Sequence, residues 1–262
     1  MLSLTPLPAL ADNYIWMLAD TAEGTALVVD PGDAGPVLEE LRSRELRLAA
    51  ILLTHHHPDH IGGTALLLKH APQARVYAPV DDRIAFTHHC VGEGDCIELE
   101  SPRARFEVLA VPGHTRTHIA YYGEGTLFCG DTLFSLGCGR LFEGTPEQML
   151  ASLDRLSALP DSTRVCCGHE YTLANAAFAR TVEPENEALH ARTFQARALR
   201  EAGRPTLPSS IGSERAANPF LRVDVLGTDR PGHESPLPHD AWSGDRVARF
   251  AALRAAKDAF RA

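Results

Sequence analysis

The chain has 262 residues and a formal net charge of −9 at pH 7, with 44% hydrophobic and 23% charged residues. This length fits one large domain, or one domain with a smaller second one, and the composition is that of an ordinary globular enzyme. The charge argues against a nucleic-acid partner, because no basic field collects phosphates. The apolar stretches are shorter than a membrane span, and residues 1–10 lack a basic start, so we expect no membrane partner, no signal peptide and a cytoplasmic location.

Short strands separated by turn residues fill the first part of the chain, with occasional helices between them. Because the strands come in runs, the pattern predicts an α/β fold in which two mixed sheets pack face to face with helices outside. We expect strands at 2–7, 14–18, 26–29, 49–53, 76–78, 96–99, 106–111, 119–122, 127–129 and 164–167, and helices at 36–45, 62–70 and 146–159.

The composition of the sequence changes after residue 172. Helix formers predict helices at 173–181, 185–201 and 245–260. Residues 205–244 are rich in Pro, Gly, Ser and Asp and are expected to form an extended loop. We therefore predict two domains, residues 1–172 and a mainly helical region at 173–262.

A dense cluster of potential metal ligands, Thr54-His55-His56-His57-Pro58-Asp59-His60, directly follows one of the apolar strands. In extended backbone alternate side chains share a side, so His55 and His57 are expected to face one ion while His56 points elsewhere. Pro58 is expected to fix a turn that places Asp59 and His60 near a second ion. A solvated histidine-rich loop or a purification tag is the alternative, but a tag lies at a terminus and does not follow a strand.

Three further sites follow strands, and each places a His or Asp directly after a glycine: Gly113-His114, Gly130-Asp131 and Gly168-His169. A lone His after Gly is weak evidence, but these sites together with the first cluster are strong evidence for a metal centre. Asp30 also follows a strand and is expected to accept the free N–H of a ligating imidazole.

Together these motifs resemble the metallo-β-lactamase superfamily, which implies an αββα sandwich with two divalent metal ions. The resemblance implies that His55, His57, His114 and Asp131 hold one ion and that Asp59, His60, His169 and the same Asp131 hold the other. Such an ion pair supplies a hydroxide nucleophile at neutral pH, and Asp59 is placed to hold or accept its proton. Zinc is the expected metal, although His and Asp ligands also accept Fe or Mn.

Further stretches resemble the glyoxalase II family of this superfamily: Asp12-Asn13-Tyr14, the run from Gly130 to Thr145, residues 168–172, Asn218-Pro219-Phe220 and residues 253–258. The resemblance implies a monomeric hydrolase of S-(2-hydroxyacyl)glutathione thioesters, with Arg140, Tyr171, Arg254 and Lys257 binding glutathione. Some relatives carry Lys and Tyr where this chain has Arg140 and Phe142, so one hydrogen bond to glutathione is expected to be missing. Residues 226–242 align with nothing in the family pattern.

Three alternatives stay open. A mononuclear iron persulfide dioxygenase needs only a His/His/Asp set and lacks the helical tail. A lactonase or β-lactamase activity is disfavoured for the same reason. A non-catalytic metal-binding protein would be expected to have lost ligands, whereas this chain keeps the full set.

Overall fold

The computed structural model describes residues 2–226 and 244–261. The chain divides into two compact units. The first unit comprises Met1–Ala110, Thr117–Gly130 and Cys166–His169, and the second comprises Val111–Arg116, Asp131–Val165 and Glu170–Ala262.

A mixed six-stranded sheet in the first unit has the order β1-β2-β3-β4-β5-β6 among the described residues. The pairs β1–β2 and β2–β3 are antiparallel, whereas β3–β4, β4–β5 and β5–β6 are parallel. Helices α1 and α3 contribute Val37, Leu41 and Leu67 to the hydrophobic cluster on one face of this sheet. The elements are β1 (Leu2–Ala9), β2 (Asn13–Asp20), β3 (Thr25–Val29), α1 (Gly35–Ser43), β4 (Arg47–Leu52), α2 (Pro58–Ile61), α3 (Thr64–His70), β5 (Arg75–Ala78) and β6 (His89–Cys90).

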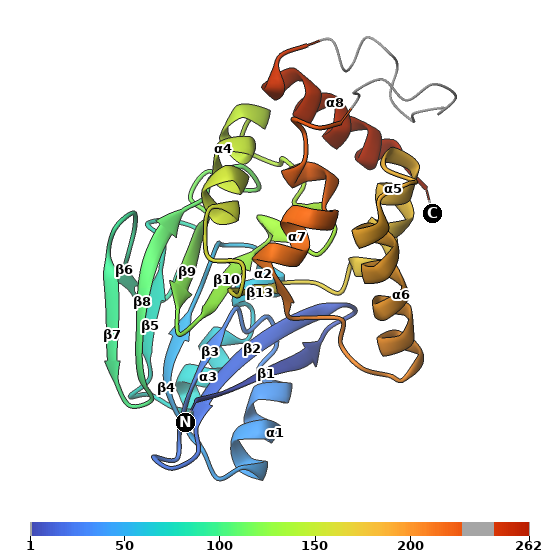
Figure 1. Cartoon of the computed structure of the whole chain (residues 1–262). Coiled ribbons are helices and arrows are strands. Elements are labelled where there is room, and N and C mark those ends of the chain that lie inside the picture. Colours follow the sequence, from blue (N-terminus) through green and yellow to red (C-terminus); the bar gives the residue numbers. More distant parts are fainter. Residues whose placement is uncertain (1, 227–243, 262) are drawn as a thin grey trace. The chain divides into compact units, whose positions relative to one another are not determined.

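A second six-stranded sheet has the order β14-β13-β10-β9-β8-β7 in the part of the chain that the structure describes (Figure 1). Neighbours β7–β8, β8–β9, β9–β10 and β13–β14 pair antiparallel. A separate hairpin joins β11 to β12. The strands are β7 (Cys96–Glu100), β8 (Arg103–Ala110), β9 (Ile119–Gly123), β10 (Thr126–Gly130), β11 (Leu133–Phe134), β12 (Gly137–Cys138), β13 (Arg164–Cys167) and β14 (Ser209–Ser210).

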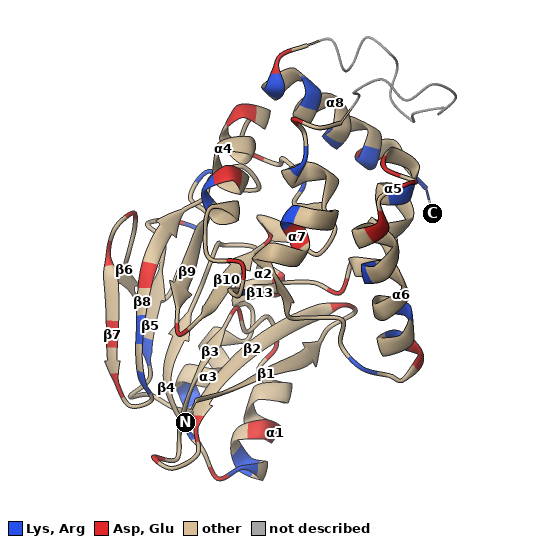
Figure 2. Cartoon of the chain, in the orientation of Figure 1, with Lys and Arg blue, Asp and Glu red and all other residues tan. Residues whose placement is uncertain are grey.

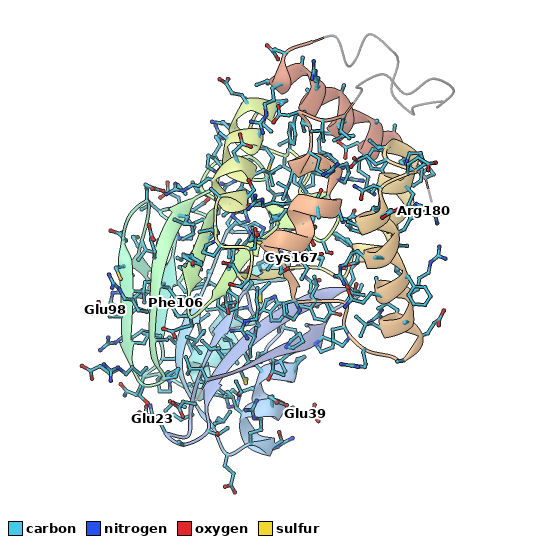
Figure 3. All side chains as sticks on the ribbon, in the orientation of Figure 1. Glu23, Glu39, Glu98, Phe106, Cys167 and Arg180 are labelled. Carbon is cyan, nitrogen blue, oxygen red and sulfur yellow. The ribbon has the colours of Figure 1, made fainter. Side chains whose placement is uncertain are left out.

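The strands follow from their hydrophobic patterns. In β7 and β8 buried and exposed residues alternate, so Phe106 is fully buried while Glu98 lies at the solvent-facing margin (Figure 3). Strand β2 is buried along nearly its whole length, because it lies inside the first sheet. Two buried polar groups link the sheets of the first unit: Trp16 donates to the Cys167 carbonyl at 2.9 Å, and the Tyr121 hydroxyl donates to the Leu53 carbonyl at 2.8 Å.

Helices dominate the second unit, and several begin at side-chain caps. Thr145 and Gln148 form a capping box at the start of α4, and Asn186 and Asp245 cap α6 and α8 by accepting backbone N–H bonds. These caps satisfy backbone donors that the first helical turn leaves unpaired. The helices are α4 (Pro146–Ser157), α5 (Thr172–Val182), α6 (Glu187–Glu201), α7 (Ile211–Ala217), the 3-10 turn η1 (Pro219–Leu221) and α8 (Arg246–Ala259).

The structure corrects the sequence prediction in one long segment. Residues 205–244 were expected to be an extended loop, but they contain β14, α7 and η1, and the Ser210 hydroxyl caps α7 by accepting from Ser213 N. Part of that segment, and most of the unaligned stretch 226–242, lies outside the described residues. The sequence prediction also missed the short elements β6, β11, β12 and α2.

No helix among the described residues is both long and apolar enough to cross a bilayer.

Candidate metal centre

The parallel strands β3 and β4 place the first site residues, because their carboxyl ends meet at one edge of the sheet. Asp30 follows β3 and accepts hydrogen bonds from Thr54 N at 2.8 Å and Thr54 Oγ1 at 2.7 Å. Gly130, at the end of β10, has φ 46°, and a Cβ there would lie 2.3 Å from Thr54 Oγ1. A glycine is therefore required where β10 approaches the loop after β4.

His55 and His57 lie on the same side of the loop after β4, as the alternation predicts. Nε2 of His55 and Nδ1 of His57 are 3.0 Å apart, and His55 is fully buried. His56 faces away, with its Nδ1 3.4 Å from Asp81 Oδ2. Hydrogen bonds from Arg83 hold the pKa of Asp81 well below its usual range, so Asp81 stays charged beside His56.

Asp59 and His60 lie on the single helical turn α2, which begins at Pro58 where the sequence predicted only a turn. Nδ1 of His60 is 3.0 Å from Asp30 Oδ2, and its Nε2 is 3.5 Å from Asp59 Oδ2. Asp30 therefore contacts an imidazole of the cluster in the way that the sequence predicted for a second layer around a metal.

His169 completes this side of the first unit. Backbone pairing fixes its place, because Tyr14 N donates to the Gly168 carbonyl at 2.8 Å. Nδ1 of His169 is 2.8 Å from Asp12 Oδ1, and its Nε2 is 3.4 Å from Asp59 Oδ2. Ligand atoms of Asp59, His60 and His169 all lie within 4.8 Å of one another.

Two more predicted ligands lie together in the second unit. Nε2 of His114 is 3.5 Å from Asp131 Oδ2, and Nδ1 of His114 is 2.9 Å from the Arg140 carbonyl. Gly139 passes so close to Asp131 that a Cβ would lie 1.9 Å from the Asp131 carbonyl oxygen. The Phe142 ring centroid is 5.2 Å from that of His114, and Phe142 is 61% exposed.

One pattern recurs at His60, His114 and His169. A carboxylate or carbonyl oxygen holds Nδ1, and Nε2 faces a carboxylate oxygen at 3.5, 3.5 and 3.4 Å. These separations are long for an N–H···O hydrogen bond. Two donors held about 2.0–2.2 Å from one tetrahedral ion lie roughly 3.3–3.6 Å apart. The donor set therefore fits divalent cations between imidazole and carboxylate, with the outer nitrogens fixing the ring tautomers.

Two of the three predicted glutathione-binding cations contact Asp258 in the second unit. Arg140 is exposed, and its Nε is 3.4 Å from Asp258 Oδ1. Nη2 of Arg254 is 3.0 Å from the same oxygen. The carboxylate of Asp258 therefore lies between the two arginines, a position that the sequence analysis did not assign.

Arg254 is buried and therefore does not belong to a solvent-exposed helix face. It is 5% exposed, its Nη1 donates to the Cys138 carbonyl at 2.7 Å, and its guanidinium lies 5.1 Å from the centroid of the Phe220 ring. Burial raises the pKa of the neighbouring Cys138 thiol to about 11, so this thiol stays protonated near neutral pH.

Lys257 and Tyr171 are the other two predicted glutathione-binding residues, and both belong to the second unit. Nζ of Lys257 is 5.7 Å from the Phe178 ring centroid, and burial followed by repulsion from Arg254 and Arg140 lowers its pKa. Tyr171 precedes α5, with its ring 5.2 Å from that of Phe134.

Sequence reasoning missed several supporting residues. Asp12 holds His169, Asn13 donates to Asp59 Oδ2 at 3.0 Å, and Asp258 holds Arg254. Their short stretches were noted only as family resemblances. No spacing rule connects Asp12 to its partner, because it lies 157 residues before His169. Asp258, in contrast, lies four residues after Arg254 on α8, and this i,i+4 spacing could have predicted the pair.

Comparison with known proteins defines the class. Residues 12–169 match the model of the metallo-beta-lactamase superfamily. The crystal structure of TTHA1623 in a di-iron-bound form is 27% identical with a TM-score of 0.60, and the alignment covers 83% of this chain and 100% of that one. The fold and its His/Asp clusters are those of a metal-dependent hydrolase of this superfamily and suit a dinuclear site. The predicted α/β fold class is thereby confirmed.

The particular family follows from the C-terminal region and from the relatives. Residues 170–260 match the model of the hydroxyacylglutathione hydrolase C-terminus. A hydroxyacylglutathione hydrolase of Xylella fastidiosa strain M12 is 54% identical over 98% of this chain and 97% of its own. One of Xanthomonas campestris pv. campestris strain B100 is 53% identical over 99% of both chains. The chain belongs to the hydroxyacylglutathione hydrolase family.

Proposed function

We propose that the protein hydrolyses S-(2-hydroxyacyl)glutathione thioesters, converting S-D-lactoylglutathione to D-lactate and glutathione in the second step of methylglyoxal detoxification. The observation that carries this proposal is the 54% identity, over nearly the full length, to a relative named hydroxyacylglutathione hydrolase. The match of the C-terminal residues 170–260 to the hydroxyacylglutathione hydrolase model supports it further.

The metal ligands are carried over from the superfamily pattern. His55, His57, His114 and Asp131 would hold one ion, and Asp59, His60 and His169, again with Asp131, would hold the second. The oxygens at Nδ1 of three of these histidines support the assignment, because they leave each Nε2 available as a ligand. Zinc is the proposed metal, with Fe or Mn as alternatives.

Two divalent ions held by these ligands would supply a hydroxide at neutral pH and would polarise the thioester carbonyl. Asp59 would hold or accept the proton that the attacking water gives up when the hydroxide forms, and the hydrogen bond from Asn13 to Oδ2 keeps this carboxylate oriented. Asp131 would act as the ligand shared by both ions. The leaving thiolate needs no strong general acid, since an ordinary thiol has a pKa near about 8.5.

Glutathione is proposed to bind through Arg140, Tyr171, Arg254 and Lys257. Three of these four are cations, which an acidic protein needs in order to bind a peptide with two carboxylates. Arg140 is exposed and Lys257 is partly buried, so these two are placed to meet a carboxylate, while Arg254 is held by Cys138 and Asp258. Phe142 offers no hydroxyl to the peptide.

Further parts of the proposal rest on sequence. We propose a boundary between domains 1–172 and 173–262, which the meeting of the two family models at residues 169 and 170 supports. A cytoplasmic location and the absence of nucleic-acid and membrane partners remain predictions that rest on composition and charge. A monomer remains a prediction that rests on the family resemblance.

The test is hydrolysis of S-D-lactoylglutathione by the purified protein, with the metal content measured on the same sample. Lys257→Ala is expected to raise KM about tenfold while largely keeping kcat, because it removes binding common to ground and transition states. Arg249→Ala on the same helix is the matched control and is expected to leave both constants unchanged. Arg254→Ala is a weaker probe, because it also truncates a buried side chain and so can destabilise the fold.

Two results would overturn the proposal. Absence of turnover at about two metals per chain would move the substrate elsewhere in the superfamily. Oxygen uptake with glutathione persulfide would then favour the persulfide dioxygenase alternative.

A further inference from the structure

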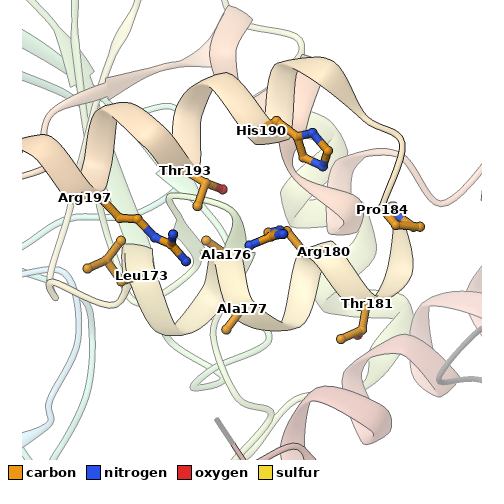
Figure 4. Close-up of a pocket in the computed structure, with 9 residues that line it drawn as sticks. All are labelled: Leu173, Ala176, Ala177, Arg180, Thr181, Pro184, His190, Thr193 and Arg197. Atoms are coloured by element: carbon orange, nitrogen blue, oxygen red, sulfur yellow. The ribbon is translucent and has the colours of Figure 1, made fainter.

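A groove runs between α5 and α6 in the second unit and encloses a cavity of about 590 Å³ (Figure 4). Cavities of roughly 300–1,000 Å³ are typical of small-molecule sites. Neither the proposed metal ligands nor the proposed glutathione-binding residues are among the residues that line it.

The lining is basic in a protein that is acidic overall. Nine residues surround the cavity, and they include Arg180, His190 and Arg197 but no Asp or Glu. The guanidinium groups of Arg180, from α5, and Arg197, from α6, extend into the space between the helices (Figure 4). Positive charge therefore gathers at this groove although the chain carries a net charge of −9.

Other arginines nearby are committed to protein partners. Arg192 of α6 is buried and donates to Ser135 and the Thr206 carbonyl, and Arg222 pairs with Glu183. In the described part of the chain, the side chains of Arg180 and Arg197 have neither a hydrogen bond nor an ion pair. Figure 2 shows basic residues along both α5 and α6. These two arginines are therefore available to an external anion.

The floor of the groove is apolar. Ala176 is buried between the helices, and Ala177 and Leu173 lie on the same face of α5. Small side chains bring the helices close, and Leu173 lies beside Arg197 at one end of the cavity (Figure 4). Ala177 also lines the cavity. An anionic group beside the arginines would thus have apolar surface next to it.

We propose that this groove binds a small organic anion, with a carboxylate or phosphate group between Arg180 and Arg197 and an apolar part on Leu173 and Ala177. Guanidinium groups bind both kinds of oxyanion in a bidentate manner, so the shared chemistry is a planar or tetrahedral oxyanion attached to an apolar body. The site goes beyond the proposed thioester hydrolysis and does not depend on it.

The test uses the metal-loaded full chain, labelled with ¹⁵N, and two probes, phenyl phosphate and benzoate. Amide resonances of Ala177 and Arg180 are expected to shift saturably with Kd on the order of 1 mM. In the double variant Arg180→Gln, Arg197→Gln the Kd is expected to rise at least about tenfold. Arg42→Gln, which removes one exposed arginine on α1, is the control for a charge change away from the groove and is expected to behave as wild type.

The comparison of the probes identifies the ligand class. Tighter binding of phenyl phosphate assigns the groove to phosphorylated molecules, and tighter binding of benzoate assigns it to carboxylic acids. The proposal is overturned if neither probe shifts the groove resonances, if shifts occur only at resonances of the metal-site histidines, or if the double variant binds as tightly as wild type. Thermal unfolding of each variant, with an unchanged midpoint, shows that lost binding is not lost folding.

Discussion

Nδ1 of His60 lies 3.0 Å from Oδ2 of Asp30, and this contact joins the end of β3 to the turn that carries two proposed metal ligands. Asp30 has φ 51° and also accepts both hydrogen bonds from Thr54. Because the carboxylate can only accept, it fixes the proton of His60 on Nδ1 and leaves the lone pair on Nε2, toward Asp59.

Asp30→Asn is therefore expected to weaken metal binding about 10–100-fold. The amide nitrogen that replaces Oδ2 cannot accept from His60, so the imidazole shifts to the tautomer with its proton on Nε2. Asn tolerates positive φ, so the backbone is preserved. Metal affinity is measured by chelator competition, and Asp33→Asn, which keeps the bond to Gly35 N, is the control. Wild-type affinity in Asp30→Asn would show that this contact does not tune the site.

The neighbours His56 and His57 are expected to differ sharply in their effect on metal content. His57→Asn removes a proposed ligand beside His55, so the metal content should fall to about half or less. His56→Asn should keep full metal content and lower the free energy of unfolding by about 1 kcal/mol, because it loses the contact with charged Asp81. Elemental analysis and urea unfolding measure the two effects. Equal metal loss in both variants would contradict the proposal that His56 is not a metal ligand.

Much of the fold, and the position of the candidate metal-ligand clusters at strand ends, could be predicted from the sequence for local physical reasons. The continuous apolar runs of β2, β3 and β4 and the alternation in β7 and β8 identify strands that bury one face or both. Ligand-rich residues directly after such strands predict a site at the strand ends. Helix α7 was missed because it has only seven residues and its composition, with Gly212 and Ser213, is that of a loop.

Contacts between distant residues could not be predicted in this way. Asp12 holds His169 only because the backbone at Asn13 and Tyr14 pairs beside Gly168 and His169. From its position near the end of a helix beside Lys257, Arg254 would be expected on a solvent-exposed face. In the structure it is buried, and its guanidinium lies over the ring of Phe220. Both outcomes depend on tertiary packing, which leaves no periodic signal in the sequence.

Lys257 is expected to make substrate binding weaker at alkaline pH. Its pKa lies below the ordinary 10.5, mainly because of burial, with Arg254 and Arg140 adding repulsion. The positive charge is therefore lost as the pH rises through that lowered pKa, and KM for a glutathione thioester should rise there. Lys257→Arg, whose guanidinium stays charged, should keep KM flat over this range, and Lys257→Gln should show a high, flat KM. Parallel KM profiles for wild type and Lys257→Arg would rule out this role.

Glu214 offers a test of stability that is independent of the metal site. Its buried carboxylate accepts from Leu136 N at 2.8 Å and from Asn218 Nδ2 at 3.2 Å, and burial raises its pKa above the ordinary value of 4.5. A carboxyl whose pKa is raised by folding contributes stability below its unfolded pKa and loses that contribution as the pH rises through the folded pKa. Wild type therefore loses stability over the pH range in which the unfolded chain, but not the folded protein, has released the proton of Glu214.

Glu214→Gln is neutral at every pH, and its amide oxygen can accept the same two bonds while its nitrogen donates to the hydroxyls of Ser209 and Ser135, which face this group. Relative to wild type, the variant should gain free energy of unfolding as the pH rises from about 4 to 7, by on the order of 1 kcal/mol. Urea unfolding at several pH values measures the difference, with the exposed Glu98→Gln as control. A difference that stays constant with pH would mean that folding does not raise the pKa of this carboxyl, and that its two acceptor bonds already offset the cost of burying the charge.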